Sequence, residues 1–553
     1  MSNFPFLIVM IALPAVGAAV VAALPKDPRG RDLLAKQVAL GISLVELVLA
    51  VLATVAFDSG GARFQLTTSV SWIPSFGVRF ALGVDGIALV MLLLIGVLVP
   101  VVIGASWHDD APGSEMAAAG NRSMRGYVAW LLLLEAMMVG VFAATDVFLF
   151  YVFFEAMLVP MYFLIGSFGG PRRQYAAVKF FLYSLVGGLI MLAAVIGLYV
   201  VSNSQLGAGT FAFDALRQLD ITPGVQKLLF LGFFIAFAIK APLVPFHTWL
   251  PDAGAEAPVG GAVLLVGVLD KVGTFGFLRY CLPLFPDASR AFAPWILVLA
   301  VVGILYAALL AMGQSDMKRL ISYTSISHFG FIALGIFAFT TEAGTGAVLY
   351  MVNHGLATGL LFLVVGMLIA RGRSRQIGDY GGVAAKAPLL GGAFLVAGLA
   401  SLALPATNSF VSEFLVLIGS FHPRPVFTIL ATVGMILAAL YILLMYQRTM
   451  QGPPRGVLLA DTAEDDAAED DVAADDERGS HGGGATTTVT APRRVLKVLD
   501  LDRRELAIVT PLIALIIALG VYPQPLLRLI EPAVHATLSD MGGAAAATGG
   551  TAR

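Results

Sequence analysis

Seven ionisable side chains lie in stretches of the sequence that are otherwise apolar over the width of a bilayer. They are Glu135, Glu155, Lys240, Lys271, His328, His354 and Glu413, and His247 ends a further apolar stretch. Ionisable groups inside a membrane are costly and usually mark a path for a substrate or an ion. Because amines, carboxylates and imidazoles all accept and release protons, this set predicts a proton path.

Forming and breaking one glutamate–lysine pair would be enough to drive proton uptake and release. Burial favours the neutral amine, whereas a nearby carboxylate favours the charged one. Opposite charges about 4 Å apart interact by roughly 4 kcal/mol at an effective dielectric constant of about 20. Moving one charge through about 100 mV costs only about 2.3 kcal/mol. Water and the hydroxyls of the run from Ser322 to Ser327 would bridge the gaps to the histidines.

Most of these residues also have a structural interpretation. Lys240 could extend its ammonium to the membrane surface from a helix end, although it lies about two turns before His247. Lys271 follows Asp270, and the two could neutralise each other locally. A lone buried histidine is more often structural, but two on neighbouring spans, between lysine and glutamate sites, favour a relay.

The sequence argues against metal and redox centres on this chain. His328 and His354 lie on different spans and have no partner at helical spacing, so we expect no metal site. Cys281 is the only cysteine, and it cannot hold an iron–sulfur cluster or form an internal disulfide, so we expect it to be structural. Asp85 is expected to make a polar contact at a helix end. No phosphate-binding loop or dinucleotide fingerprint is present, so redox cofactors belong on other chains.

The composition is typical of a polytopic membrane protein. Hydrophobic residues make up 58% of the 553 residues, charged residues make up 13%, and the mean hydropathy is +0.87. Soluble domains are about a quarter charged. No basic cluster indicates a nucleic-acid partner, and the first apolar run lacks the basic start of a signal peptide, so we read it as a span.

The apolar runs predict an all-α protein with fourteen transmembrane helices. The expected spans are 5–24, 37–57, 81–105, 127–144, 147–167, 176–201, 227–248, 257–284, 293–313, 319–340, 344–370, 387–420, 425–447 and 506–523. Prolines break the seventh span after Lys240 and the twelfth at Pro405. Broken helices at corresponding positions of two halves are typical of transporters built from inverted repeats. A short sequence match at an offset of 167 residues, Leu182-Tyr183 with Leu349-Tyr350, supports such a repeat.

These spans divide the chain into five parts. Residues 1–126 hold spans 1–3, residues 127–284 the first five-helix repeat, residues 285–450 the second, residues 451–505 an acidic loop, and residues 506–553 the last span and tail. The acidic loop contains the run from Asp461 to Glu477 and is too polar to form a core, so we expect a solvated, disordered segment. A docking tail is the alternative.

The positive charges orient the chain in the membrane. Twenty-three of the 34 lysines and arginines fall in odd-numbered loops, nine fall on the other side, and Lys240 and Lys271 lie inside spans. Because cytoplasmic loops are rich in Lys and Arg, the odd-numbered loops are expected in the cytoplasm. An even number of spans then places both termini outside.

Three segments resemble the proton-translocating membrane subunits of complex I and of multi-subunit cation/proton antiporters. They are the run from Phe237 to Asp252 that includes Lys240 and His247, the run from Phe153 to Tyr162 that includes Glu155, and the run from Lys318 to His328. The resemblance covers about residues 80–450. One departure is Gly254, where relatives often have histidine.

The resemblance also implies a subtype and a role for each site residue. Relatives of the L and N types and antiporter chains generally carry lysine at the position of Glu413, whereas M-type subunits carry glutamate. In this family Glu155 would modulate Lys240, Lys271, His328 and His354 would form a central wire, and Glu413 would be the terminal proton site.

The implied function is proton translocation within a respiratory NADH-quinone oxidoreductase in a bacterial plasma membrane. FMN, iron–sulfur clusters and quinone would bind to partner subunits, which include L-type and N-type chains. The alternatives are a subunit of a Na⁺(K⁺)/H⁺ antiporter or of a membrane-bound hydrogenase.

Overall fold

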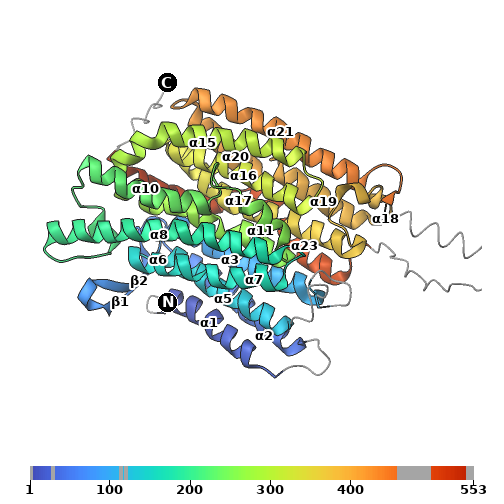
Figure 1. Ribbon diagram of the computed structural model, residues 1–553, viewed down its shortest axis with the longest axis horizontal. Helices are drawn as coiled ribbons and strands as arrows, with labels where there is room; N and C mark the ends of the chain where they lie inside the picture. The colour runs from blue at the N-terminus through green and yellow to red at the C-terminus, as the bar shows by residue number, and fades with distance from the viewer. Residues whose placement is uncertain (1–3, 26–31, 111–115, 117–122, 457–499, 543–553) are drawn as a thin grey trace, which may run out of the picture.

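The computed structural model describes residues 4–25, 32–110, 116, 123–456 and 500–542. In this part of the chain, long apolar helices run side by side along the longest axis of the molecule (Figure 1). Among the described residues, thirteen helical segments are long and apolar enough to cross a membrane. The predicted acidic loop lies almost wholly outside the described residues.

The first half contains these helices: α1 (Phe6–Ala23), α2 (Leu33–Ala56), α3 (Gly86–Ala105), α5 (Met124–Ala143), α6 (Val147–Ala156), α7 (Leu158–Phe168), α8 (Arg173–Leu206), α10 (Pro223–Lys240) and α11 (Leu250–Glu256). One bent span follows as α12 (Val259–Leu264), η3 (Leu265–Leu269), α13 (Lys271–Gly276), η4 (Phe277–Cys281) and α14 (Leu282–Leu284). Both η segments of this span are π-helical.

The second half contains these helices: α15 (Pro286–Met312), α16 (Met317–Phe337), α17 (Thr341–Gly372), α19 (Pro388–Ser401), α20 (Asn408–Phe421), α21 (Pro425–Met450), α23 (Arg503–Val521) and α24 (Gln524–Asp540). The segments between the long helices contain the short helices α9 (Phe213–Leu216), α18 (Val383–Lys386), η2 (Ser106–His108) and η5 (Ile377–Asp379), and η1 (Pro74–Phe76) lies in the turn of a hairpin.

Most unbroken spans agree with these helices to within five residues. Two predicted starts were wrong: the third span was predicted from residue 81, which lies in strand β2 (Val78–Val84), and the ninth from residue 293, whereas α15 begins at Pro286. The predicted span 387–420 is two shorter helices, α19 and α20, with a break at Leu402–Thr407. The predicted span 227–248 is helical only as far as Lys240. The predicted span 147–167 is also interrupted, at Met157 between α6 and α7.

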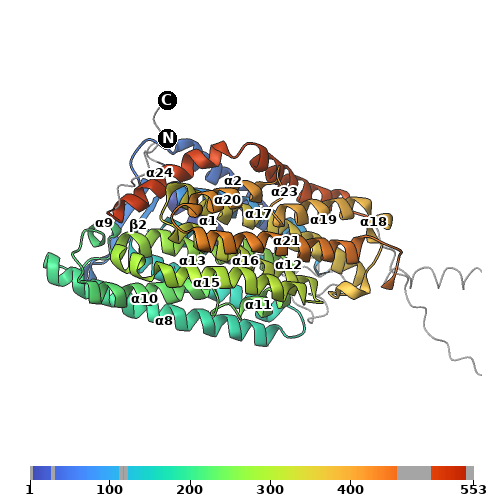
Figure 2. The same ribbon diagram turned by 90° about the horizontal axis from the view of Figure 1, so that it is seen from above.

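Helix α17 and the bent span α12–α14 form the centre of the bundle. Their most apolar windows are wholly buried, whereas that of α2 is 28% buried and that of α21 is 33% buried. Seen from above, α8 and α10 line one edge of the bundle and α23 and α24 line the opposite edge (Figure 2). The central helices therefore touch protein on all sides, and polar side chains on them can only face other helices.

A two-stranded hairpin and a terminal amphipathic helix were not predicted. Strand β1 (Gln65–Ile73) pairs antiparallel with β2 (Val78–Val84), and Gly77 turns the chain with a φ of 64°. Helix α24 packs on α3, α14 and α17. A Cβ atom at Gly86, the first residue of α3, would overlap the carbonyl oxygen of Leu529, so this close approach of α24 requires glycine.

Candidate functional site

Glu155 and Lys240 face each other across the interface between α6 and α10. The charges of the two side chains interact, but no direct ion pair is closed between them. Lys240 Nζ is buried without a hydrogen-bond partner and lies 5.2 Å from the ring centroid of Phe154 and 5.4 Å from that of Phe180. A Cβ atom at Gly188 of α8 would overlap the Glu155 carboxylate, so glycine opens the space that this carboxylate occupies.

The break after Lys240 follows directly from the local sequence. Pro242 and Pro245 have no backbone N–H to donate, so the helix ladder cannot continue. Trp249 donates its indole N–H to the carbonyl of Ile239 over 2.9 Å and satisfies one of the acceptors that the break leaves. The lysine therefore lies at the C-terminal end of α10, where a helix favours positive charge.

Lys271 binds His354 rather than its sequence neighbour Asp270. Its Nζ lies 2.6 Å from Nδ1 of His354 and also donates to the carbonyl of Val266. Val266 belongs to the π-helical segment immediately before α13. The local neutralised pair with Asp270 does not form, so the central lysine is free to exchange a proton with an imidazole.

Asp270 is a site residue to which the sequence analysis gave no role of its own. Its side chain is fully buried, neither carboxylate oxygen has a hydrogen-bond partner, and its charge interacts with both Lys240 and Lys271. The helices that carry the two lysines pack closely, because a Cβ at Gly273 would lie 2.6 Å from the amide nitrogen of Ala241. The signal in the sequence was a carboxylate directly before a buried lysine, a pattern that also fits a locally neutralised pair.

The two predicted relay histidines are brought together next to Glu413. The rings of His328 and His354 are 5.2 Å apart between centroids and nearly perpendicular. Tyr350 lies 5.8 Å from His328 between ring centroids, and its hydroxyl donates to Glu413 Oε2 over 3.4 Å. A continuous line of buried polar side chains therefore runs from Lys271 through both histidines and Tyr350 to Glu413.

The broken twelfth span positions Glu413 and contacts the relay. Asn353 of α17 donates to the carbonyl of Asn408 over 2.7 Å, and Asn408 donates back to the carbonyl of Asn353 over 3.2 Å. The ring of His328 forms a hydrogen bond with the backbone of Ser401, the last residue of α19. The end of α19 at this break thus supplies a backbone hydrogen-bond partner for His328. The two hydrogen bonds between Asn353 and Asn408 hold the start of α20 against α17.

The hydroxyl-rich segment of α16 bonds mainly to backbone carbonyls. Ser322 donates to the carbonyl of Lys318, Ser325 to that of Ile321, and Ser327 to that of Ile304 on α15, over 2.9 to 3.0 Å. Their oxygens can still accept hydrogen bonds. Gly254 packs against this segment, and a Cβ there would overlap Ser322 Oγ, so a side chain at this position would require Ser322 to move.

Two predicted residues lie apart from this line. His247 is beside Tyr306, with ring centroids 5.5 Å apart, and its Nδ1 has no hydrogen-bond partner. Glu135 on α5 has no basic partner, and the charge that acts on it is that of Glu46 on α2. Neither residue forms a hydrogen bond or an ion pair with Lys240, Lys271 or the histidine pair.

Asp85 and Cys281 were predicted to have structural roles. Asp85 caps α3 by accepting a hydrogen bond from Ala88 N, as expected for a helix-end contact, and it also forms a 2.7 Å ion pair with Arg279. The orientation count placed Arg279 among the residues outside, but this residue is buried within the bent span. Cys281 is buried and unpaired. Among the described residues, no group of three or more His, Cys, Asp or Glu could hold a metal.

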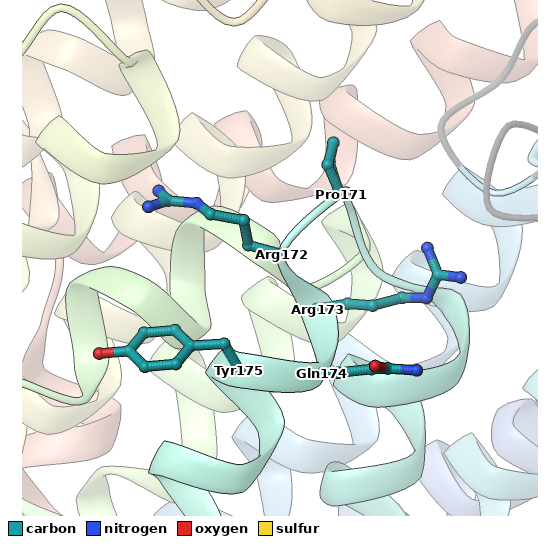
Figure 3. A pocket seen from close by; sticks show the side chains of 5 residues that line it. All are labelled: Pro171, Arg172, Arg173, Gln174 and Tyr175. Carbon is teal, nitrogen blue, oxygen red and sulfur yellow. The ribbon is translucent and has the colours of Figure 1, made fainter.

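Ion pairs gather where the odd-numbered loops meet the bundle. Asp252 of α11 accepts from Lys179 of α8 over 2.7 Å and from Arg319 of α16 over 2.6 Å. Burial alone would raise the pKa of Asp252, but these two hydrogen bonds hold it below its ordinary value. Nearby, Pro171, Arg172, Arg173, Gln174 and Tyr175 line a surface hollow at the start of α8 (Figure 3). This hollow lies outside the buried line.

Comparison with known proteins shows which family the sequence is similar to. Residues 144–438 match the family model described as NADH:quinone oxidoreductase/Mrp antiporter, TM. The chain is 45% identical to NADH-quinone oxidoreductase subunit M of Mycobacterium tuberculosis, over 98% of this chain and 95% of that protein. It is 36% identical to subunit M of Rhodobacter capsulatus, over 97% of this chain and 98% of that protein.

Solved structures share the fold. A chain of respiratory complex I from Thermus thermophilus with bound NADH superimposes with a TM-score of 0.80 at 30% identity, covering 97% of this chain and 100% of that one. A chain of the Mrp complex from Dietzia gives a TM-score of 0.78 at 24% identity, covering 98% of this chain and 100% of that one. The second likeness concerns the fold alone.

Proposed function

The chain belongs to the NADH:quinone oxidoreductase/Mrp antiporter transmembrane family, and we propose that its buried ionisable residues carry protons through the M subunit of complex I. The chain is a membrane subunit of an NADH-quinone oxidoreductase, which couples NADH oxidation and quinone reduction to proton pumping. Its partners are the other membrane and peripheral subunits of that complex, including the L-type and N-type subunits.

The observation that carries the proposal is the buried line from Lys271 to Glu413. Lys271 contacts His354, His354 contacts His328, and Tyr350 joins the histidine pair to Glu413. Each of these groups except Tyr350 gains and loses protons readily, and the tyrosine hydroxyl can pass a proton by donating and accepting in turn. Lys271 is thus the centre of the wire and Glu413 its end.

The other end of the wire is the Glu155–Lys240 pair, and Asp270 connects it to Lys271. In the open arrangement of this structure, Lys240 Nζ has no hydrogen-bond partner, so closing the pair would favour its charged form. Closing and opening the pair changes which lysine holds the proton, because Asp270 interacts with both. Rearrangements in partner subunits would drive this exchange. The hydroxyls of α16 and water would complete the path.

Redox chemistry is assigned to the partner subunits. One cysteine cannot supply the thiolates of an iron–sulfur cluster, so FMN, iron–sulfur clusters and quinone would bind to other chains. The excess of Lys and Arg in odd-numbered loops supports a bacterial plasma-membrane orientation with both termini outside. The two inverted five-helix repeats, residues 127–284 and 285–450, remain part of this proposal.

A mutant series in the assembled complex tests the assignment. Lys240→Ala, Glu155→Ala and Glu413→Ala should each strongly reduce proton pumping and quinone-linked turnover. NADH oxidation by artificial acceptors should be unchanged, because electron entry lies on other subunits. Cys281→Ala is the matched buried control and should pump like the wild type. Wild-type pumping in the first two variants would refute the assignment.

Purification in mild detergent distinguishes the second candidate, an antiporter or hydrogenase subunit. Co-purification with flavin and iron–sulfur subunits that oxidise NADH supports the complex I assignment. A complex that lacks redox centres and exchanges Na⁺ or K⁺ for protons would support the antiporter. Glu413 favours the first outcome, because antiporter chains generally carry lysine at this position.

A further inference from the structure

A pair of buried glutamates lies at the interface of α2 and α5, away from the line from Lys271 to Glu413. Glu46 is near the middle of α2 and Glu135 near the middle of α5. Their exposed fractions are 1% and 0%, the two helices pack directly, and the two charges interact. The two carboxyl groups are therefore buried at the same helix interface, close enough for their charges to interact, although they are 89 positions apart in the sequence.

These carboxyl groups have no compensating partner. All four of their oxygens are buried, and none accepts a hydrogen bond from a described residue. Helices α1 and α3, which also pack on α2, contain no ionisable side chain. Within α2 and α5, Lys36 bonds to Asp110 and Arg125 to the carbonyl of Leu24. Both basic residues are about ten positions from the glutamates, or about 15 Å along a helix.

Ionisable residues on the other elements packed against α5 have different partners or none. These residues are Arg79 on β2, Tyr151 and Glu155 on α6, Tyr162 on α7 and Lys271 on α13. None of them forms a hydrogen bond or an ion pair with either glutamate. Tyr127 of α5 itself bonds to Ser106. Among the residues that the structure describes, no basic side chain forms a hydrogen bond or an ion pair with either glutamate.

Two ionised carboxylates cannot persist together in such surroundings. An unpaired buried charge is strongly disfavoured, and a second negative charge beside it adds repulsion. Neighbouring carboxyls elsewhere resolve this conflict by keeping a proton. We propose that Glu46 and Glu135 form a second proton-binding site, in which at least one carboxyl is held protonated against the other.

A metal cation fits this site poorly. Hard cations such as Ca²⁺ and Mg²⁺ take six or more oxygen ligands, whereas this pair offers four oxygens between apolar helices. The nearest hydroxyl along α2, that of Ser43, donates to the carbonyl of Leu40. The site joins the N-terminal helices to the first predicted repeat and does not depend on the roles proposed for the lysines.

Carbodiimide labelling of the intact, assembled complex tests the proposal without any mutation. Dicyclohexylcarbodiimide is apolar and modifies protonated carboxyls, and peptide mass spectrometry locates the adduct. At pH 7 the wild type should carry an adduct on Glu46 or Glu135, and 100-fold changes in Na⁺ concentration should not alter its yield. Absence of an adduct at both positions, or protection by Na⁺, would overturn the proposal.

Single variants then test whether the two carboxyls act on each other. Labelling requires a protonated carboxyl, so its yield falls as the pH rises. In Glu46→Gln, the pH above which Glu135 is no longer labelled should be lower than in the wild type by about one unit or more, because the neighbouring negative charge is gone. Glu135→Gln should have the same effect on Glu46. Ser43→Ala, one turn away on α2, should leave the pH limit of labelling unchanged. An identical pH limit in the wild type and both glutamine variants would refute the coupling.

Discussion

Lys271 Nζ lies 2.6 Å from His354 Nδ1, although Asp270 is its neighbour in the sequence. This contact joins the bent span to α17, two wholly buried elements. The contact makes His354 the residue with which Lys271 can exchange a proton directly. It also leaves the Asp270 carboxylate free to interact with Lys240.

Replacing His354 should disconnect the central lysine from Glu413. In His354→Gln the side chain keeps hydrogen-bonding groups but cannot carry a proton at neutral pH. We expect pumping by the assembled complex to fall about tenfold or more, because a positioned proton donor or acceptor typically contributes about 10²–10⁴-fold to a rate. Pumping is measured as acidification-dependent dye quenching in proteoliposomes. His247→Gln is the matched control and should have a smaller effect, because His247 lies apart from the line.

Asp270 should matter through its charge. Asp270→Asn removes the carboxylate that interacts with both lysines while keeping its volume. We expect pumping and quinone-linked turnover to fall about tenfold, with assembly preserved. Asp270→Glu should restore part of both activities. If the asparagine variant pumps normally, Asp270 has only a structural role and the link between Lys240 and Lys271 runs elsewhere.

The Asp85–Arg279 ion pair should contribute to folding and assembly rather than to proton transfer. The two residues are almost fully buried, and Asp85 also caps α3. Removing one partner of a buried pair leaves an uncompensated charge and typically costs about 3–5 kcal/mol. Arg279→Met should therefore lower the amount of assembled complex, as measured by native gel and subunit immunoblot. Arg290→Met, at an exposed ion pair, should cost much less.

The Asp252 contacts should stabilise the complex at neutral pH and less so in acid. Hydrogen bonds from Lys179 and Arg319 lower the pKa of this carboxyl below its ordinary value, so their stabilisation is present above that value. It is lost as the pH falls through the lowered pKa. Asp252→Asn should thus reduce the thermal stability of the complex at pH 7, by about 1–3 kcal/mol.

Thermal melts of the wild-type and Asp252→Asn complexes over a pH series provide the measurement. The difference between their melting temperatures should shrink toward acidic pH, because protonation makes the wild-type side chain neutral as well. A difference that is constant with pH would mean that the charge of Asp252 contributes nothing.

The sequence alone determined the spans and the ionisable positions. Hydrophobic length fixes where the chain crosses the membrane, and proline removes the N–H groups that a helix needs, so the breaks after Lys240 and at Pro405 were predictable. The hairpin of residues 65–84 was missed because the end of β2 continues directly into the apolar run of α3, so residues 81–84 were assigned to the third span. Glu155, Lys271 and Glu413 were found from the sequence because each is an ionisable residue inside an apolar span.

Only the tertiary structure decided which ionisable groups meet. Whether Lys271 turns to Asp270 or to His354 depends on the π-helical turn before it and on the packing of α17 against the bent span. The pairing of Glu135 with Glu46 depends on the rotation of α2 about its axis. Hydropathy is nearly uniform around such helices, so the sequence carries little information on which face meets which neighbour. Close packing between helices fixes those faces.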